Sequence, residues 1–85
     1  MSELDVLRKD IDRLDKEIAE LLLSRFDVVK EIGAVKKREN LPITNAGREE
    51  EVISKVRSIA LDPADKDALE TAYRAIIAAS KGLEK

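Results

Sequence analysis

An apolar seam through the first 38 residues constrains the fold of this chain more than any other feature. Its side chains recur in steps that alternate between three and four residues, at Leu4, Leu7, Ile11, Leu14, Ile18, Leu21, Val28, Ile32 and Val35, with Arg25 at the position between Leu21 and Val28. This spacing places them on one face of a helix, which we predict from residue 2 or 3 to residue 38 or 39. Ser2 and Asp5 form a capping pair at its start, and Asn40 followed by Pro42 marks its end.

The length of this helix predicts an oligomer. A helix of about 35 residues extends about 52 Å, whereas a compact domain of this size has a diameter of about 30 Å. The rest of the chain is too short to cover the seam along its whole length, but a second copy of the same helix can cover it. We therefore predict an intertwined two-fold homodimer in which the subunits share their long helices.

Two shorter helices are predicted after the long one, which makes residues 1–85 a single all-α domain. Strand signals such as sustained alternation are missing. Thr44 or Asn45 should cap the second helix, whose apolar stripe comprises Val52, Val56 and Ile59, with Ile53 and Ala60 beside it. Asp62 should cap the third helix, with Pro63 in its first position. Its stripe comprises Leu69, Tyr73, Ile76, Ser80 and Leu83, with Ile77 adjacent.

The composition excludes several classes of function. Without cysteine or histidine, the chain cannot use thiol or imidazole groups as nucleophiles or metal ligands. Its 16 basic and 18 acidic residues, with two aromatic side chains (one tyrosine and one phenylalanine), form no pattern typical of nucleic-acid binding. No apolar run approaches the roughly 20 residues of a membrane span, and the N-terminus "MSELDVLRKD" is too charged for a signal peptide. We expect a soluble, cytoplasmic protein that binds neither nucleic acid nor a membrane.

Polar residues interrupt the apolar stripe of each predicted helix. Those on the stripes are Arg25, Glu49 and Ser80, and those at the adjoining position are Arg8, Lys36 and Glu84. Each alone has an ordinary explanation. Arg25 could extend its charge to solvent or fix the register of a coiled coil, Glu49 could favour the start of its helix, and Ser80 could permit close packing. The residues at the adjoining position could simply be solvated. Together they predict a cavity for a small ligand with at least two negative groups, because buried cations would otherwise repel one another. Gly33, inside the long helix, is consistent with an open wall of that cavity.

Three segments carry a resemblance to a known family. The segments "LRKDIDRLDKEI", "LLLSRFDVVKEIGAVK" and "LPITNAGREEEV" closely resemble the all-helical class of chorismate mutases, and the resemblance covers residues 4–84. It implies an intertwined three-helix homodimer with two active sites, each completed by the partner's long helix. It also implies the rearrangement of chorismate, a dianion with a hydroxyl group, to prephenate on the route to phenylalanine and tyrosine.

The resemblance also implies roles for the predicted cations and for the apolar wall. Arg25, together with Arg8 from the other subunit, resembles the family's clamps on the substrate carboxylates. Lys36 resembles the cation that contacts both the breaking ether oxygen and a carboxylate. The residues that would form the apolar wall are Ile32, Val52 and Ile77.

The remaining site residues are assigned in the same way, with two departures. Glu49 resembles the acceptor for the ring hydroxyl, Arg48 the arginine that supports the site, and Ser80 the serine near the ring carboxylate. Asn45 stands where aspartate is common, and we expect little loss because this position contributes through helix capping. Glu84 stands where glutamine is common, which changes the chemistry at the ether oxygen.

The implied reaction suits a chain that lacks histidine and cysteine. A pericyclic rearrangement needs no nucleophile, metal or cofactor, so the protein must only hold a near-attack chair and stabilise charge on the ether oxygen. Arginine binds carboxylates bidentately, and lysine supplies a point charge. Glu84 can donate to the ether oxygen only when protonated. We therefore expect activity to fall as the pH rises, and Glu84→Gln to flatten that profile.

Two alternatives stay open at this point. One is an isochorismate pyruvate lyase on the same scaffold, although "REEEV" and Lys36 favour the mutase. The other is a non-catalytic helical dimerisation module whose charges fix the register. The initial Met and the end soon after the last motif favour a free-standing protein over a module excised from a fusion. The sequence identifies no activating partner enzyme of the pathway.

Overall fold

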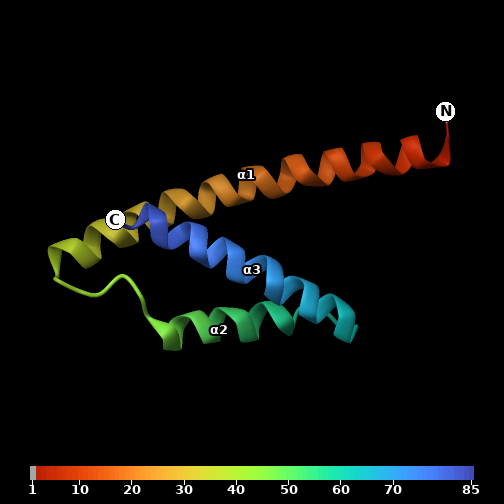
Figure 1. Ribbon diagram of the computed structural model, residues 1–85. Coiled ribbons are helices and arrows are strands. Elements are labelled where there is room, and N and C mark those ends of the chain that lie inside the picture. Colours follow the sequence, from red (N-terminus) through yellow and green to blue (C-terminus); the bar gives the residue numbers. More distant parts are fainter. Residues whose placement is uncertain (1) are drawn as a thin grey trace.

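Three helices make up most of residues 2–85, the part of the chain that the computed structural model describes. They are α1 (Glu3–Arg38), α2 (Ala46–Arg57) and α3 (Pro63–Leu83), and this part of the chain contains no β-strand. Figure 1 shows α1 as a long rod, while α2 and α3 form a hairpin that returns the C-terminus to the later half of α1. The predicted all-α class and helix order are confirmed. No helix within residues 2–85 is both long and apolar enough to cross a bilayer.

The shape of the chain is elongated because α1 projects beyond the other two helices (Figure 1). The principal extents are 56 × 26 × 15 Å, and the radius of gyration is 16.1 Å. A compact chain of this size would have a radius of gyration of about 12 Å. The helix contacts run from α2 to α3 and from α3 to α1. The prediction that one helix is too long for a globule is therefore confirmed.

Side-chain caps fix the starts of the three helices where the sequence predicts them. The side chains of Ser2, Asn45 and Asp62 each accept a backbone N–H from the first turn of their helix, at 3.1, 3.1 and 2.7 Å. Each cap satisfies one of the N–H groups that a helix start leaves without a partner. Asn45 thus provides the helix capping that we expected at this position.

A Schellman motif ends α1 and reverses the chain. Asn40 adopts the left-handed conformation, with φ 58°, which asparagine tolerates better than most residues. The Leu41 N–H donates to the Lys36 carbonyl at 2.8 Å, and the Asn40 N–H donates to the Lys37 carbonyl at 3.4 Å. The reversal leads the chain past the end of α1, and the carbonyl of Ile43 then lies beside the Lys36 side chain.

The buried core is small and lies where α3 packs against α2 and against the later half of α1. Its buried apolar side chains are Val29, Ile53, Val56 and Ile77. The prediction that Ile59 continues the stripe of α2 is wrong. The helix ends at Arg57, so Ile59 lies in the connection to α3, where it is 77% exposed.

The apolar seam of α1 is largely uncovered in a single chain. Exposure along it ranges from 37% at Val35 to 71% at Leu21. The residues of α1 that are buried within the chain are Val29 and Gly33, which lie beside the seam rather than on it. This exposure agrees with the prediction that a second copy covers the seam, and the homodimer itself stays a prediction.

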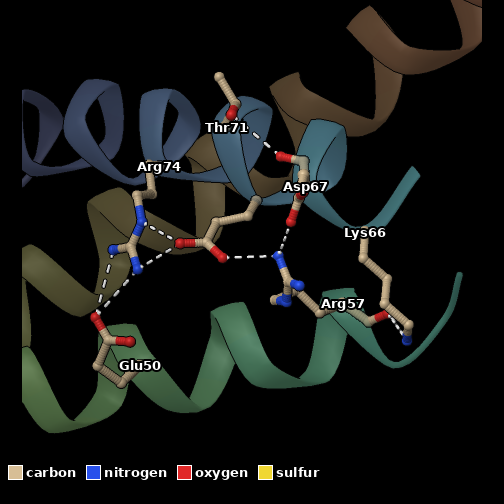
Figure 2. Close-up of polar contacts among 7 residues, drawn as sticks. Glu50, Arg57, Lys66, Asp67, Thr71 and Arg74 are labelled. Carbon is tan, nitrogen blue, oxygen red and sulfur yellow. Dashed lines mark hydrogen bonds and ion pairs between the residues drawn. The ribbon is translucent and has the colours of Figure 1, made fainter. Parts of the chain in front are cut away.

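An ion-pair network joins α2 to α3 (Figure 2). Arg57 lies 2.9 Å from carboxylate oxygens of both Asp67 and Glu70, and Arg74 lies 2.8 Å from Glu70 and 3.3 Å from Glu50. The pKa of each arginine is raised, mainly by the hydrogen bond that Arg57 donates to Asp67 and the one that Arg74 donates to Glu70. Every arginine of this network therefore has a protein carboxylate as its counter-ion.

Candidate active site

A cavity of about 330 Å³ lies between the later half of α1, the start of α2 and the end of α3. The residues that line it are Arg25, Val29, Ile32, Lys36, Ile43, Asn45, Arg48, Glu49, Val52, Ile77, Ser80, Lys81 and Glu84. All of the predicted site residues except Arg8 are in this set. The volume is near the lower limit for sites that bind small molecules.

Arg8 lies outside this cavity in the single chain. It precedes Arg25 by 17 positions on the same helix (25 − 8), which corresponds to about 26 Å along the helix axis. Its side chain is exposed on the part of α1 that projects beyond α2 and α3. Arg8 is therefore too far away to line the cavity of its own chain, and the role in a partner's cavity that the resemblance implies stays a prediction.

Val29, Ile43 and Lys81 line the cavity without having been predicted from the sequence. Val29 follows Arg25 by four residues and Lys81 follows Ile77 by four, so each shares a helix face with a predicted site residue. That spacing is the signal that could have found them. Ile43 belongs to the connection between α1 and α2, where no periodicity predicts the path of the chain.

Arg25 contributes a cation that is held by neutral groups. Its Nη1 donates to Ser80 Oγ at 2.7 Å, and Ser80 Oγ donates in turn to the carbonyl of Ile76 at 2.7 Å. The guanidinium carbon also lies 5.8 Å from the centroid of the Tyr73 ring, within the range of a cation–π interaction. Among residues 2–85, no carboxylate lies within ion-pair distance of Arg25, so its positive charge is oriented but not neutralised.

Lys36 joins the connection after α1 to the end of α3. Its Nζ donates to the Ile43 carbonyl at 2.7 Å and lies 3.2 and 3.3 Å from the two carboxylate oxygens of Glu84. The side chains of Lys36 and Glu84 are only 20% and 10% exposed. Lys36 and Glu84 thus form a partly buried ion pair between α1 and the end of α3. The expectation that Glu84 donates to the ether oxygen stays a prediction.

Gly33 allows the end of α3 to approach α1 closely. A Cβ built on Gly33 would lie 2.8 Å from both the Cα and the carbonyl oxygen of Glu84. Such distances are too short for any side chain, so only glycine fits between these two backbones. The expectation that Gly33 keeps a wall of the cavity open is therefore wrong, because the backbone of Glu84 occupies the space beside it. Gly33 instead allows Glu84 to lie beside Lys36.

The start of α2 contributes an ion pair to the cavity. Glu49 Oε2 lies 3.0 Å from Lys81 Nζ on the last turn of α3, and the two side chains are partly buried. The neighbouring Arg48 is exposed and pairs with Glu51 at 3.3 Å. Within the chain, Arg48 therefore touches the cavity but has its ion-pair partner outside it.

The charges that line the cavity leave it net positive. The cations are Arg25, Lys36, Arg48 and Lys81, and the anions are Glu49 and Glu84. Four positive and two negative groups give a net charge of +2 (4 − 2), in a chain whose overall charge is −2. A lining of this sign attracts a small dianion, and its apolar side chains can surround the uncharged part of such a molecule.

Comparison with known proteins classifies the chain and its fold. The chorismate mutase type II family matches residues 7–85. The chain belongs to this family. The resemblance that the three quoted segments carry is thereby confirmed.

Two curated relatives of this family member are much longer than the chain itself. The bifunctional chorismate mutase/prephenate dehydratase of Aquifex aeolicus (strain VF5) is 42% identical over 89 residues, which cover 100% of this chain and 25% of that protein. The T-protein of Enterobacter agglomerans is 40% identical over 57 residues, which cover 67% of this chain and 15% of that protein. The chain thus spans a quarter or less of the length of these curated relatives.

Solved structures share the chorismate mutase fold over nearly the whole chain. The structure of chorismate mutase (form II) from Thermus thermophilus has a TM-score of 0.90 and 31% identity, and the match covers 98% of this chain and 94% of that one. A conserved hypothetical protein from Pyrococcus furiosus has a TM-score of 0.82 and 32% identity, with coverage of 100% and 99%. The arrangement of α1, α2 and α3 is therefore that of the family.

Proposed function

We propose that this chain is a chorismate mutase, an intramolecular isomerase that converts chorismate to prephenate for the synthesis of phenylalanine and tyrosine. The observation that carries the proposal is Arg25, a cation that lines the cavity and has no carboxylate within ion-pair distance among residues 2–85. The net positive lining and membership of the chorismate mutase type II family support the same conclusion. Chorismate carries two carboxylates, which would supply the missing negative charge.

In this proposal Arg25 binds one carboxylate of the substrate. Ser80 and Tyr73 already hold its guanidinium in place, so little side-chain freedom would be lost on binding. A guanidinium presents parallel N–H groups that match a carboxylate bidentately. The second carboxylate would bind Lys36 and Arg8 of the partner subunit. Two fixed carboxylates would hold the substrate in the compact chair from which it reacts.

The ether oxygen would be stabilised from two sides, by Lys36 and Glu84. A protonated Glu84 would donate its O–H to the ether oxygen, and Lys36 would direct one of its three N–H groups to the same atom. Donors aimed at the oxygen that gains charge lower the barrier for breaking the C–O bond.

The remaining lining residues would position the ring of the substrate. Glu49 would accept a hydrogen bond from the ring hydroxyl, with Arg48 supporting this end of the site. Asn45 would act through its cap on α2. An apolar wall would surround the carbon skeleton and exclude water, and its residues would be Ile32, Val52 and Ile77.

The proposal includes a homodimer. Seam residues such as Leu21, which is 71% exposed, leave an apolar surface in contact with water along nearly all of α1, and such a surface is unfavourable in a monomer. A second α1 would cover it and would bring Arg8 of the partner subunit toward the cavity. The cytoplasmic location expected from the charged N-terminus stays a prediction.

The test is a direct assay of the purified chain that follows the loss of chorismate and the formation of prephenate. We expect Arg25→Ala to lower kcat/KM by at least about 100-fold, because a charged, preorganised contact is lost. Arg13→Ala is the matched control. Arg13 is an exposed α1 arginine outside the cavity that already pairs with Glu17, so this variant should match the wild type.

The same assay separates the two alternatives. A folded wild-type dimer that leaves chorismate unchanged would overturn the proposal. Release of pyruvate from isochorismate by that protein would assign the lyase instead. If the protein converts neither substrate but sediments as an intact dimer, the non-catalytic dimerisation module is the correct alternative.

A further inference from the structure

Lys81 is a cavity cation to which the family resemblance gave no role. It lies on the last turn of α3, directly after Ser80, and its Nζ lies 3.0 Å from Glu49 Oε2. Glu49 lies in the first turn of α2, so the pair connects the beginning of one helix to the end of the next. Both charges also suit their helix ends, since a carboxylate favours a helix start and an ammonium favours a helix end.

The contact leaves part of the Glu49 carboxylate available. Among residues 2–85, no donor makes a hydrogen bond to either carboxylate oxygen of Glu49, and Lys81 is the cation within ion-pair distance of this side chain. The adjacent Arg48 is bound to Glu51 and does not compete for Glu49. Lys81 can therefore restrain the carboxylate as an ion pair while the carboxylate keeps lone pairs that can accept a hydrogen bond from a ligand.

The restraint matters because Glu49 shares the cavity with cations other than Lys81. Arg25 and Lys36 line the same cavity, and Arg25 has no carboxylate partner in the described chain. A glutamate side chain has three rotatable bonds, so an unrestrained Glu49 could turn toward these cations and occupy the place of a substrate carboxylate. The ion pair with Lys81 opposes that movement.

We infer that Lys81 is a positioning residue, which holds Glu49 at the α2 side of the cavity so that its carboxylate accepts a hydrogen bond from the ring hydroxyl of the substrate. The inference rests on the proposed chorismate mutase function. It adds a residue to that function, because Lys81 acts on the substrate through Glu49 and not by direct contact.

The experiment is a double-mutant cycle measured with chorismate as the substrate. Lys81→Met removes the ammonium but keeps a long side chain, and we expect kcat/KM to fall about 10-fold, mostly through a higher KM, because the hydroxyl contact contributes similarly to ground state and transition state. Lys81→Arg keeps a cation and should stay within about threefold of the wild type. In a Glu49→Gln background, Lys81→Met should change kcat/KM by less than about twofold, because the carboxylate with which Lys81 pairs is already absent.

The control is Lys55→Met, which removes a lysine from the last turn of α2 that does not line the cavity. It should leave both kinetic constants unchanged. Wild-type kinetics in Lys81→Met would overturn the positioning role. A 10-fold loss that persists in the Glu49→Gln background would also overturn it, since Lys81 would then act on the substrate directly. If the wild type itself fails to convert chorismate, the proposed function fails first, and the inference falls with it.

Discussion

Replacing Gly33 by alanine would insert one methyl group where α1 and the end of α3 are closest. The new Cβ would lie 2.8 Å from the Cα and the carbonyl oxygen of Glu84, whereas ordinary van der Waals contact begins at 3.4 Å. The two backbones must therefore separate by about 0.6 Å (3.4 − 2.8). The obstructing atoms belong to the backbone, so no change of side-chain rotamer can relieve the contact.

Two opposite terms set the effect of Gly33→Ala on stability. Alanine in a helix interior is favoured over glycine by about 1 kcal/mol, and overpacking costs about 1–3 kcal/mol. We expect the free energy of unfolding to fall by about 0–2 kcal/mol. Activity should fall further, because Glu84 would move relative to Lys36. A displacement of about 1 Å can cost about 100-fold, so a shift of about 0.6 Å should cost about 10-fold in kcat.

Gly82→Ala is the matched control for this prediction. Gly82 also lies in a helix near the C-terminus, but a Cβ there would meet no atom within 4 Å. Urea unfolding and the loss of chorismate are measured for both variants. Gly82→Ala should be as stable as the wild type or slightly more stable, with unchanged kcat. If Gly33→Ala behaves in the same way, the close approach of Glu84 to Gly33 does not determine where Glu84 lies.

Three further predictions test the charges and the seam. Arg25→Met should raise the free energy of unfolding by about 1 kcal/mol, because an unneutralised charge is replaced by an apolar side chain. The same variant should no longer convert chorismate. A lower stability in thermal unfolding would contradict this prediction. Wild-type kcat should fall as the pH rises, because only protonated Glu84 donates to the ether oxygen, and Glu84→Gln should give a flat profile; a wild-type rate that is constant from mildly acidic to alkaline pH excludes this role. Leu21→Glu should place charges at the dimer interface and yield monomers in sedimentation, and dimers of unchanged affinity would show that the seam is not the interface.

The sequence predicts the helices well because their signals are local. These signals depend on residues within one or two turns of each other: the alternation of three and four along α1, the caps at Ser2, Asn45 and Asp62, and the end of α1 at Asn40. The length of α1 follows from the same pattern. The error at Ile59 has the same origin, because an apolar residue at the right spacing does not show that the helix has already ended at position 57.

The cavity was predicted less completely because it depends on contacts between distant residues. Gly33 approaches Glu84 across 51 positions of the chain (84 − 33), and no helical period contains that contact. Lys81 was missed because its partner Glu49 lies on another helix. Helical spacing from a known site residue finds the face on which Lys81 lies, but only the packing of α2 against α3 reveals which carboxylate it contacts.

Arg25 differs from Arg57 and Arg74 in the groups that hold its guanidinium. Arg57 and Arg74 each have carboxylate partners outside the cavity, and the hydrogen bonds that they donate join α2 to α3 (Figure 2). Arg25 is held instead by a hydroxyl group and an aromatic ring, which fix its direction and leave its charge uncompensated. A cation kept only for stability would gain more from a carboxylate, and the outer network shows that this chain can supply one. The neutral surroundings of Arg25 therefore favour a role in which the counter-ion arrives with the substrate.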